Sequence, residues 1–407
     1  MTDAIHDVII IGGGASGLLC TRECARRGLK TVILEKEPLV GRKILASGNG
    51  RCNLTNTRVS PAYYHADPAL ISATLSQFSY EDCHRYFEQL GVLLTEEENG
   101  RIFPATGKAT AVLEPLKLAA TESAAEILTS HTVTHIKRAK LFTVQTKEGP
   151  VFQTRNVVLA CGSCAYPQVS GSSGGYELAR TLGHHITPLR PALSGLCLQE
   201  NFSRLAGIRA QVKLHVSAPN AVPSEGEIIF TNYGINGPAA LNVSSAISRE
   251  LQNGPVHITL NFLPRLTDAT SFWEERLKIF ANRKPKDFFA GVLHESLANL
   301  LIDFKGLRKN KPMSAQFPSA VKQALETVHA WPATVTALRP WNEAMVAAGG
   351  VNLKEINYNT FESLLCPHLY IIGELLDVDG QSGGFNLHFA WASGLIAAKH
   401  LAQENKA

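Results

Sequence analysis

Three glycines near the N-terminus have the spacing of a dinucleotide-binding turn. Gly12, Gly14 and Gly17 form a G-x-G-x-x-G pattern within the sequence GGGASG. In such a turn the first glycine permits the tight bend, the second lets a pyrophosphate approach the backbone, and the third lets helix and strand pack closely. Glu35 follows eighteen residues after Gly17, where a carboxylate can accept hydrogen bonds from both hydroxyls of an adenosine ribose. The same carboxylate would repel a 2′-phosphate, so bound NADP is disfavoured.

The elements expected around these glycines support the same interpretation. Residues 8–11 are an apolar, β-branched run, typical of a strand buried in a parallel sheet. Residues 15–27 predict a helix that ends at Gly28, and residues 31–34 predict a second strand. The helix N-terminus favours a phosphate anion through its unpaired N–H groups and its dipole. A glycine turn that binds nothing is the alternative, and the agreement of all these elements argues against it.

A second glycine-rich turn lies near the C-terminus, within residues 368–403. There a buried strand is followed by a glycine pair and by a helix predicted to begin at Asn386 or Leu387. A helix N-terminus aimed at the pyrimidine edge of an isoalloxazine would stabilise the negative charge of a reduced flavin. Glu374 or Asp377 could bind a ribityl hydroxyl or approach the diphosphate through water. The nucleotide-binding domain is therefore expected to be built from both ends of the chain.

Cys161 and Cys164 have the C-x-x-C spacing of a redox dithiol, which a flavin could reduce. They directly follow a predicted strand at residues 157–160, where a turn needs small residues. The favoured interpretation is a coincidence of small residues, and the redox role stays open.

Histidines and basic residues add two weaker candidates. His84, His184 and His185 have no Cys, Asp or Glu at metal-ligand spacing, so surface or loop histidines and no metal site are predicted. Arg101 and Lys108 flank the sequence GRIFPATGK and could hold an anionic substrate. That segment lacks the G-K-[ST] ending of a P-loop.

Composition indicates a globular protein of two or three domains. The chain has 407 residues, 45% of them hydrophobic, and a net charge of +4 from 39 basic and 35 acidic side chains. This charge is spread without long runs, so nucleic acid is not expected as a partner. No signal peptide or membrane-spanning run is found, and eight irregularly spaced cysteines do not form a disulfide framework. A cytoplasmic protein is expected.

The order of the predicted elements indicates an α/β fold with two insertions. A doubly wound, discontinuous domain is predicted at residues 1–190 and 345–407. A barrel-like β domain is predicted at 191–264 and 329–344, because short strands replace helical periodicity there. Residues 265–328 predict a small helical insertion. The Gly- and Asn-rich residues 41–56 predict a long loop without helix or strand, and further strands are expected at residues 132–136, 141–146, 151–154 and 157–160.

Seven motifs, in order, resemble a bacterial flavoprotein family. They are GGGASG, GRKILASGNGRCNLTN, GRIFP, GSSGGYELARTLGH, FTNYGINGPAALNVSS, AAGGVNLKEIN and GELLDVDGQSGGFNLHFAWASG. On these motifs the chain is similar to the HI0933-like family of the two-dinucleotide-binding-domain flavoproteins. Members include NAD(P)/FAD-dependent oxidoreductases, aminoacetone oxidases and a bile-acid pathway reductase. The resemblance is specific to the family and not to a substrate.

The resemblance implies FAD as the cofactor and a set of residues that would bind it. Glu35 would hold the ribose, Val133 would contact the adenine through its backbone, and the loop from Arg42 to Asn53 would lie along the diphosphate and flavin. The full expected set is Gly12, Gly14, Ala15, Ser16, Gly17, Glu35, Lys36, Arg42, Lys43, Gly48, Gly50, Arg51, Cys52, Asn53, Val133, Ala160, Gly162, Gly373, Glu374, Asp377, Gly384, Phe385, Asn386 and Leu387.

The function expected from this resemblance is an FAD-dependent oxidoreductase. Hydride would pass through flavin N5 between a small organic substrate and NAD(P)H or O₂. No second complete G-x-G-x-x-G occurs, so NAD(P)H would act as a transient reductant without a domain of its own. Two alternatives stay open: an FAD-dependent tRNA-modifying enzyme, and a flavin-bound regulatory protein without turnover. No catalytic residue and no oligomeric state is assigned.

Overall fold

The computed structural model describes residues 5–218 and 221–405, which divide into two compact units. The first unit falls within residues 1–192 and 341–407, and the second within residues 193–340. Every residue of the expected cofactor set belongs to the first unit.

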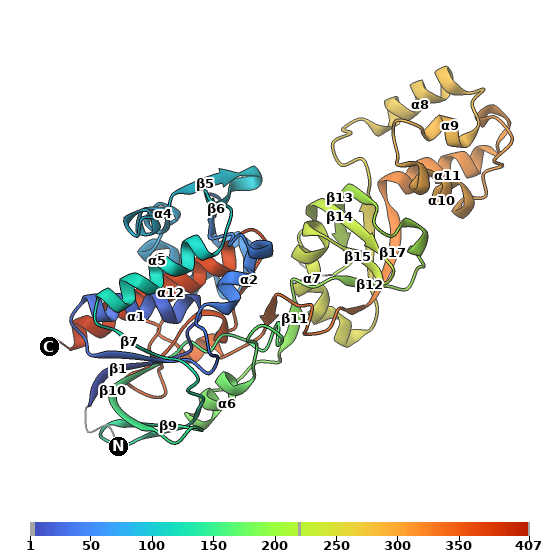
Figure 1. Cartoon of the computed structure of the whole chain (residues 1–407). Helices are drawn as coiled ribbons and strands as arrows, with labels where there is room; N and C mark the ends of the chain where they lie inside the picture. The colour runs from blue at the N-terminus through green and yellow to red at the C-terminus, as the bar shows by residue number, and fades with distance from the viewer. Residues whose placement is uncertain (1–4, 219–220, 406–407) are drawn as a thin grey trace. The chain divides into compact units, whose positions relative to one another are not determined.

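The first unit is built on a parallel sheet with the strand order β7-β2-β1-β10-β19 (Figure 1). Numbered along the chain, this order is 3-2-1-4-5, which is the order of a Rossmann-like sheet. Strands β1, β2 and β19 and the second half of β10 are almost entirely buried, as expected where both faces of a parallel sheet are covered, whereas the edge strand β7 is partly exposed. Their bounds are β1 (His6–Ile11), β2 (Thr31–Leu34), β7 (Glu126–Leu128), β10 (Val151–Leu159) and β19 (Leu369–Ile371).

Strand β10 joins this sheet to an antiparallel hairpin. The hairpin consists of β8 (Val133–Arg138) and β9 (Phe142–Thr146), and β9 pairs with the first half of β10. The prediction of two separate strands at 151–154 and 157–160 was wrong, because one strand continues through both. The first half pairs with β9 and the second half with β19, so that ladder hydrogen bonds support the whole length.

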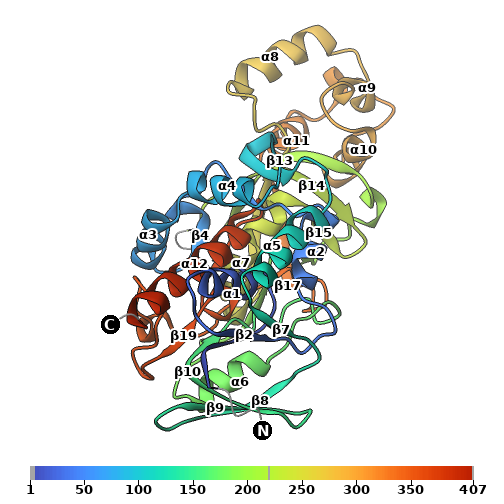
Figure 2. The same ribbon diagram turned by 60° about the vertical axis from the view of Figure 1, so that its left-hand side comes forward.

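Three helices pack together against this sheet, as Figures 1 and 2 show. They are α1 (Ala15–Arg26), α5 (Thr110–Glu122) and α12 (Phe385–Glu404). A Cβ on Gly394 of α12 would lie 2.5 Å from the carbonyl oxygen of Ser16 in α1. The first and last long helices therefore touch through backbone atoms, and only glycine permits this approach.

The segment at residues 41–56 begins with a helix, so the prediction of a loop was wrong for its first half. Helix α2 (Arg42–Gly50) is regular until Ser47, where the backbone leaves the helical region. Gly48 and Asn49 both have φ of 56°. The first five residues favour a helix, whereas Gly and Asn tolerate the left-handed conformation that ends it.

The remaining elements of the first unit form short sheets and helices around this core. The short sheets pair β3 (Thr55–Asn56) and β5 (Leu94–Glu97) with β6 (Arg101–Pro104), β4 (Tyr64–His65) with β20 (Asp379–Gly380), and β11 (Arg190–Ala192) with β18 (Val346–Ala348). The helices are α3 (Pro68–Gln77), α4 (Tyr80–Gln89) and α6 (Gly174–Thr181).

The second unit contains a closed barrel with the strand order β12-β15-β14-β13-β16-β17. The strands are β12 (Leu196–Leu198), β13 (Arg209–Val216), β14 (Ser224–Thr231), β15 (Gly234–Asn236), β16 (Val256–Asn261) and β17 (Trp331–Leu338). Helix α7 (Pro238–Glu250) packs against five of them, although no helix was predicted between residues 191 and 264. Its buried positions are mainly Ala and Ser, so few large apolar side chains mark the buried face of this helix in the sequence.

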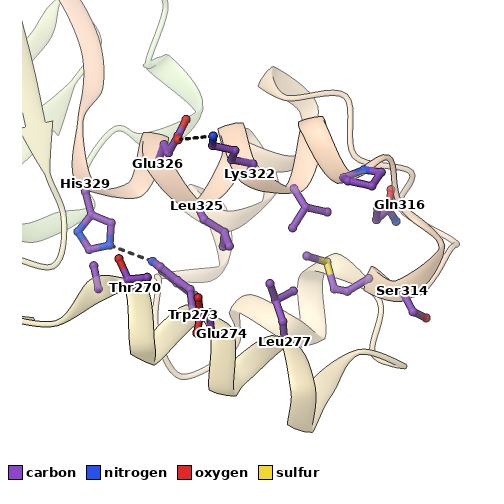
Figure 3. Close-up of a pocket in the computed structure, with 14 residues that line it drawn as sticks. Thr270, Trp273, Glu274, Leu277, Ser314, Gln316, Lys322, Leu325, Glu326 and His329 are labelled. Carbon is purple, nitrogen blue, oxygen red and sulfur yellow. Dashed lines mark hydrogen bonds and ion pairs between the residues drawn. The ribbon is translucent and has the colours of Figure 1, made fainter.

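Four helices at residues 269–329 complete the second unit. They are α8 (Ala269–Phe280), α9 (Pro285–Phe289), α10 (Glu295–Phe304) and α11 (Pro318–His329). A groove of about 780 Å³ lies between α8, residues 313–316 and α11. Figure 3 shows Trp273 and His329 at one end of this groove, joined by a hydrogen bond of 2.9 Å, and Gln316 at the other.

The predicted fold class is confirmed: a Rossmann-like α/β domain carries an inserted barrel and a set of helices. The barrel and the helices at residues 269–329 fall in one compact unit. The division of the chain into three separate domains therefore stays a prediction. None of the helices within residues 5–218 and 221–405 has the length and apolar character needed to cross a lipid bilayer.

Candidate functional site

The glycine turn after β1 is packed so tightly that two of its glycines are required. Gly12 has φ of 109°, and a Cβ there would lie 2.4 Å from the carbonyl oxygen of Ala160. A Cβ on Gly17 would lie 1.9 Å from the carbonyl oxygen of Gly12. These contacts bring α1 close to the carboxyl ends of β1 and β10.

Gly14 differs from its neighbours because it faces open space. No atom lies within 4 Å of a Cβ built at Gly14, and this residue caps α1 without a side-chain hydrogen bond. The N–H groups of Ala15 and Ser16 begin the helix behind it. An uncapped helix N-terminus beside open space fits the diphosphate of the expected FAD.

Glu35 lies directly after β2, with its side chain turned toward the glycine turn. One carboxylate oxygen accepts a hydrogen bond from the N–H of Gly13 at 2.6 Å, and the other accepts from the N–H of Glu37 at 2.8 Å. Each oxygen has a second lone pair for a ribose hydroxyl. The N–H of His131 donates to the Glu35 carbonyl oxygen at 2.8 Å, so the segment that leads to Val133 lies at the same end.

Each cation of the loop at residues 42–53 has a carboxylate partner in the chain. Arg42 pairs with Glu37, and exposed Lys36 lies 3.6 Å from the same carboxylate. Arg51 pairs with Glu97 and lies over the ring of Phe103. The third cation, Lys43, pairs with Glu374 at 2.9 Å. The positive charge expected along this loop is therefore balanced within the described residues.

A group of three polar side chains forms where β10 and β19 end. Glu374 follows β19, and its two oxygens accept hydrogen bonds from Lys43 Nζ at 2.9 Å and from Ser163 Oγ at 2.7 Å. The Lys43 ammonium also donates to Ser163 Oγ at 3.4 Å. A Cβ on Gly373 would lie 2.5 Å from Ser16 Oγ, so this group lies beside the first turn of α1. Residues 331 apart in the chain thus meet at the carboxyl edge of the sheet.

Ser163 was missed by the sequence analysis, although two of its neighbours were in the expected set. Ala160 directly follows β10 and is buried, and Gly162 has φ of 66°. The signal that could have identified Ser163 is its position, because a polar residue just after a buried parallel strand lies at the ligand-binding edge. The analysis of this stretch considered the two cysteines instead.

The turn before α12 is held by Asn53 and Asn386. The amide of Asn53 donates to the Thr55 carbonyl oxygen and accepts from the N–H of Gly384, both at 3.2 Å. The amide of Asn386 bonds both the N–H and the carbonyl oxygen of Gly380 at 2.8 Å. These contacts fix the loop that precedes the first turn of α12, which contains Phe385 and Leu387.

Four further expected residues have structural roles in this region. Asp377 accepts hydrogen bonds from Thr187 Oγ1 at 2.9 Å and from the N–H of Gly349 at 3.1 Å. Cys52 is fully buried with φ of 60°, and a Cβ on Gly48 would lie 2.9 Å from the N–H of Asn53. Gly50 has φ of 83° at the end of α2. These residues shape the loops at this edge, and their contact with a cofactor stays a prediction.

Cys161 and Cys164 are free thiols. Burial raises the pKa of Cys161 to about 12, and burial also raises the pKa of Cys164 above its ordinary value. Both thiols are therefore protonated at neutral pH, which disfavours attack on a disulfide. Whether the two thiols have a redox role stays open.

His184 lies in the loop after α6, which agrees with the prediction of surface or loop histidines, but it is not on the surface. This side chain is buried, with Nδ1 3.0 Å from Glu355 and Nε2 2.8 Å from Ser363 Oγ. The exposed His185 contacts the other oxygen of Glu355 at 2.6 Å. Glu355 lies 171 residues from His184, so no local spacing could reveal this partner. His84 lies on α4 beside Glu88 at 3.2 Å.

One group of possible metal ligands appears within the described residues. Ligand atoms of Glu362, His400 and Glu404 lie within 4.8 Å of one another. The hydroxyl of Tyr370 lies between two of them, 2.8 Å from His400 Nδ1 and 2.9 Å from Glu404 Oε2. This hydroxyl supplies a hydrogen-bond partner to both side chains.

Known proteins resemble this chain over nearly its whole length. A family model described as HI0933-like protein Rossmann domain matches residues 6–400. A 3-dehydro-bile acid delta(4,6)-reductase of Clostridium scindens is 34% identical over 404 residues, covering 97% of this chain and 98% of the relative. A ribosomal RNA dihydrouridine synthase of Escherichia coli is 30% identical over 403 residues, with 97% and 98% covered.

A solved structure with the same fold is a 3-ketosteroid delta1-dehydrogenase of Sterolibacterium denitrificans. It matches with a TM-score of 0.51 at 12% identity, covering 98% of this chain and 100% of that chain. At this identity the likeness concerns the fold alone.

Proposed function

Because the chain belongs to the HI0933-like family, we propose that it is an FAD-dependent oxidoreductase. Hydride would pass through flavin N5 between a small organic substrate and NAD(P)H or O₂. The observation that carries the proposal is the arrangement at the carboxyl edge of the sheet. There the open turn at Gly14 and the Lys43–Ser163–Glu374 group, which comes from distant parts of the chain, both adjoin the first turn of α1.

The residues at this edge would divide the binding of FAD between them. The turn from Gly12 to Gly17 and the N-terminus of α1 would hold the diphosphate, and Glu35 would hold the adenosine ribose. Lys43, Ser163 and Glu374 would face the flavin end. When bound, the flavin supplies the hydride transfer, and the chain supplies orientation and electrostatics.

The names of the relatives suggest the class of substrate. A delta(4,6)-reductase acts on carbon–carbon double bonds, and dihydrouridine is uridine with its C5–C6 double bond saturated. In a 3-oxo steroid and in uracil such a bond is conjugated to a carbonyl group, which makes its β-carbon a hydride acceptor. We therefore propose an activated carbon–carbon double bond as the reacting group.

Anaerobic spectroscopy of the purified protein tests this proposal. The protein should be yellow and should release FAD on denaturation. NADH or NADPH should bleach the flavin absorbance, and an enone or O₂ should restore it. A colourless protein that cannot be reconstituted with FAD would contradict the proposal. A yellow protein that no donor reduces would instead favour a flavin-bound protein without turnover.

A second candidate substrate is a uracil base in RNA, and the Escherichia coli relative favours it. The test is incubation of reduced protein with RNA, followed by nucleoside mass spectrometry for uridine that has gained two hydrogens. If the RNA is unchanged while an enone is reduced, the result favours a small-molecule substrate over RNA.

A further inference from the structure

Two short basic segments that are far apart in the chain meet at one end of the helical segment. The N–H of Met313 donates to the carbonyl oxygen of Arg283 at 2.8 Å, and the N–H of Ser314 donates to the carbonyl oxygen of Ala281 at 2.8 Å. These bonds bring the loop at residues 308–314 beside the C-terminal end of α8. Five exposed cations lie on the two loops and are here called the basic face: Arg283, Lys284, Arg308, Lys309 and Lys311.

The charge of this region is strongly positive. Residues 276–311 contain nine Lys or Arg and three Asp or Glu. Two of the three acids are paired with lysines, Glu295 with Lys286 and Asp303 with Lys309. Within the described residues no ion pair joins the other four cations of the basic face to a carboxylate. The expectation against nucleic acid rested on the lack of one long basic run, and folding creates such a surface from two short ones.

A buried glutamine holds the loop at residues 308–311 in place. Gln316 is 7% exposed, and its Oε1 accepts a hydrogen bond from the N–H of Arg308 at 2.8 Å. Its Nε2 donates to the carbonyl oxygens of Arg308 at 2.8 Å and of Lys311 at 2.9 Å. Figure 3 shows Gln316 at the end of the groove between α8 and α11. The loop is thus ordered before any partner binds, which lowers the entropy lost on binding.

An exposed aromatic ring lies next to these cations. Phe317 is 62% exposed, and the guanidinium carbon of Arg308 lies 4.7 Å from its ring centroid. Proteins that bind single-stranded nucleic acid combine cations along the backbone with aromatic rings on which bases stack. An acidic peptide or anionic lipid headgroups would use the charges, whereas the base of a nucleotide can in addition stack on the exposed ring.

We propose that the basic face, with Phe317, binds single-stranded RNA. The cations contact phosphates, and the Phe317 ring or the Arg308 guanidinium plane stacks on a base. RNA is also the second candidate substrate of the proposed function, and binding to the basic face is measured separately from the flavin reaction.

Fluorescence anisotropy with a labelled single-stranded RNA, measured on the full chain at several KCl concentrations, tests the inference. The test variant is Lys284→Gln with Lys311→Gln, because both side chains are exposed and Gln316 contacts only the backbone of the loop. The matched control is Lys137→Gln with Lys140→Gln, which removes the same charge from exposed positions of the first unit. The logarithm of the association constant falls linearly with the logarithm of the salt concentration. We expect this fall to become less steep in the test variant alone, by about 1.4 in the magnitude of the slope.

Phe317→Ala separates stacking from charge. It should weaken RNA binding by about tenfold while leaving the salt slope unchanged. Vesicles of neutral and anionic lipid and polyglutamate are the competing probes, and they should bind more weakly than RNA. The inference is overturned if the wild type does not bind RNA at low salt, if test and control variants bind alike, or if vesicles bind as tightly. Flavin content, measured on each variant, reports on the proposed function separately.

Discussion

The ammonium group of Lys43 lies 2.9 Å from the carboxylate of Glu374, although 331 residues separate them. One comes from α2 and the other from the turn after β19, and Ser163 from the end of β10 completes the group. Three chain segments are therefore joined at a single carboxylate. Because this group lies beside the first turn of α1, it connects the two ends of the chain exactly where the cofactor is expected to bind.

Replacing Lys43 should weaken cofactor binding. Lys43→Met would leave the carboxylate of Glu374 half-buried without its cation, and a charge-assisted hydrogen bond contributes about 1.5–3 kcal/mol. We expect the dissociation constant of FAD, measured by flavin fluorescence, to rise by about tenfold or more. Lys117→Met, which breaks a surface pair with Glu114, is the control and should change nothing. Equal affinities for both variants would contradict this role.

The two kinds of glycine in the first turn should respond differently to alanine. Gly17→Ala forces a backbone clash with Gly12, so the protein should lose stability even without cofactor. Gly14→Ala meets no atom of the chain, so the thermal midpoint of the apoprotein should stay unchanged. The added methyl group would nevertheless occupy the space expected for the diphosphate, and FAD titration should show at least tenfold weaker binding. Normal FAD affinity in Gly14→Ala would place the cofactor elsewhere.

Acid should loosen the attachment of α12 through His388. Burial lowers the pKa of this side chain to about 4, and its ring contacts Thr55 Oγ1 at 2.8 Å and the Phe78 carbonyl oxygen at 3.2 Å. The folded state therefore keeps His388 neutral while the unfolded state takes up a proton below about pH 6.5. The contribution is fully present above that pH and is lost as the pH falls toward 4, by about 3 kcal/mol in total.

The measurement for His388 is the thermal midpoint of the apoprotein between pH 7 and pH 5. The midpoint should fall with pH in the wild type and should fall less steeply in His388→Gln. The exposed His215→Gln is the control and should keep the wild-type slope. The slope is informative even if His388→Gln is less stable at every pH.

The thiols of Cys161 and Cys164 should react slowly at neutral pH. The raised pKa of both groups keeps them protonated, so alkylation by iodoacetamide should be slow at pH 7 and should accelerate above pH 9. Cys164→Ser should leave the reduction of the flavin unchanged. Rapid alkylation at pH 7, or a disulfide found by mass spectrometry in the oxidised protein, would support a redox dithiol instead.

Local patterns predicted the parts of the site that depend on neighbouring residues. The turn from Gly12 to Gly17 and the strand before Glu35 follow from residue types within one βαβ unit, and the barrel follows from short strands. The family and the oxidoreductase class were identified from the order of the motifs, and both agree with the relatives.

Long-range pairing was the part that the sequence did not reveal. The bonds of Ser163 and Lys43 to Glu374 depend on which strands are adjacent, and the burial of His184 depends on a carboxylate 171 residues away. Helix α7 was missed for another reason: its buried face consists mainly of small residues such as Ala240 and Ser244, so large apolar side chains do not mark its periodicity.

The close approach of Gly394 to Ser16 has a consequence for synthesis on the ribosome. The N-terminal βαβ unit emerges first, but β19, which extends its sheet beyond β10, and its packing partner α12 are translated only after the barrel and the helices are complete. More than three hundred further residues must therefore be synthesised before the sheet and the helical layer of the early unit can be completed. Flavin capture should then be a late event, and nascent chains stalled before residue 369 should hold none.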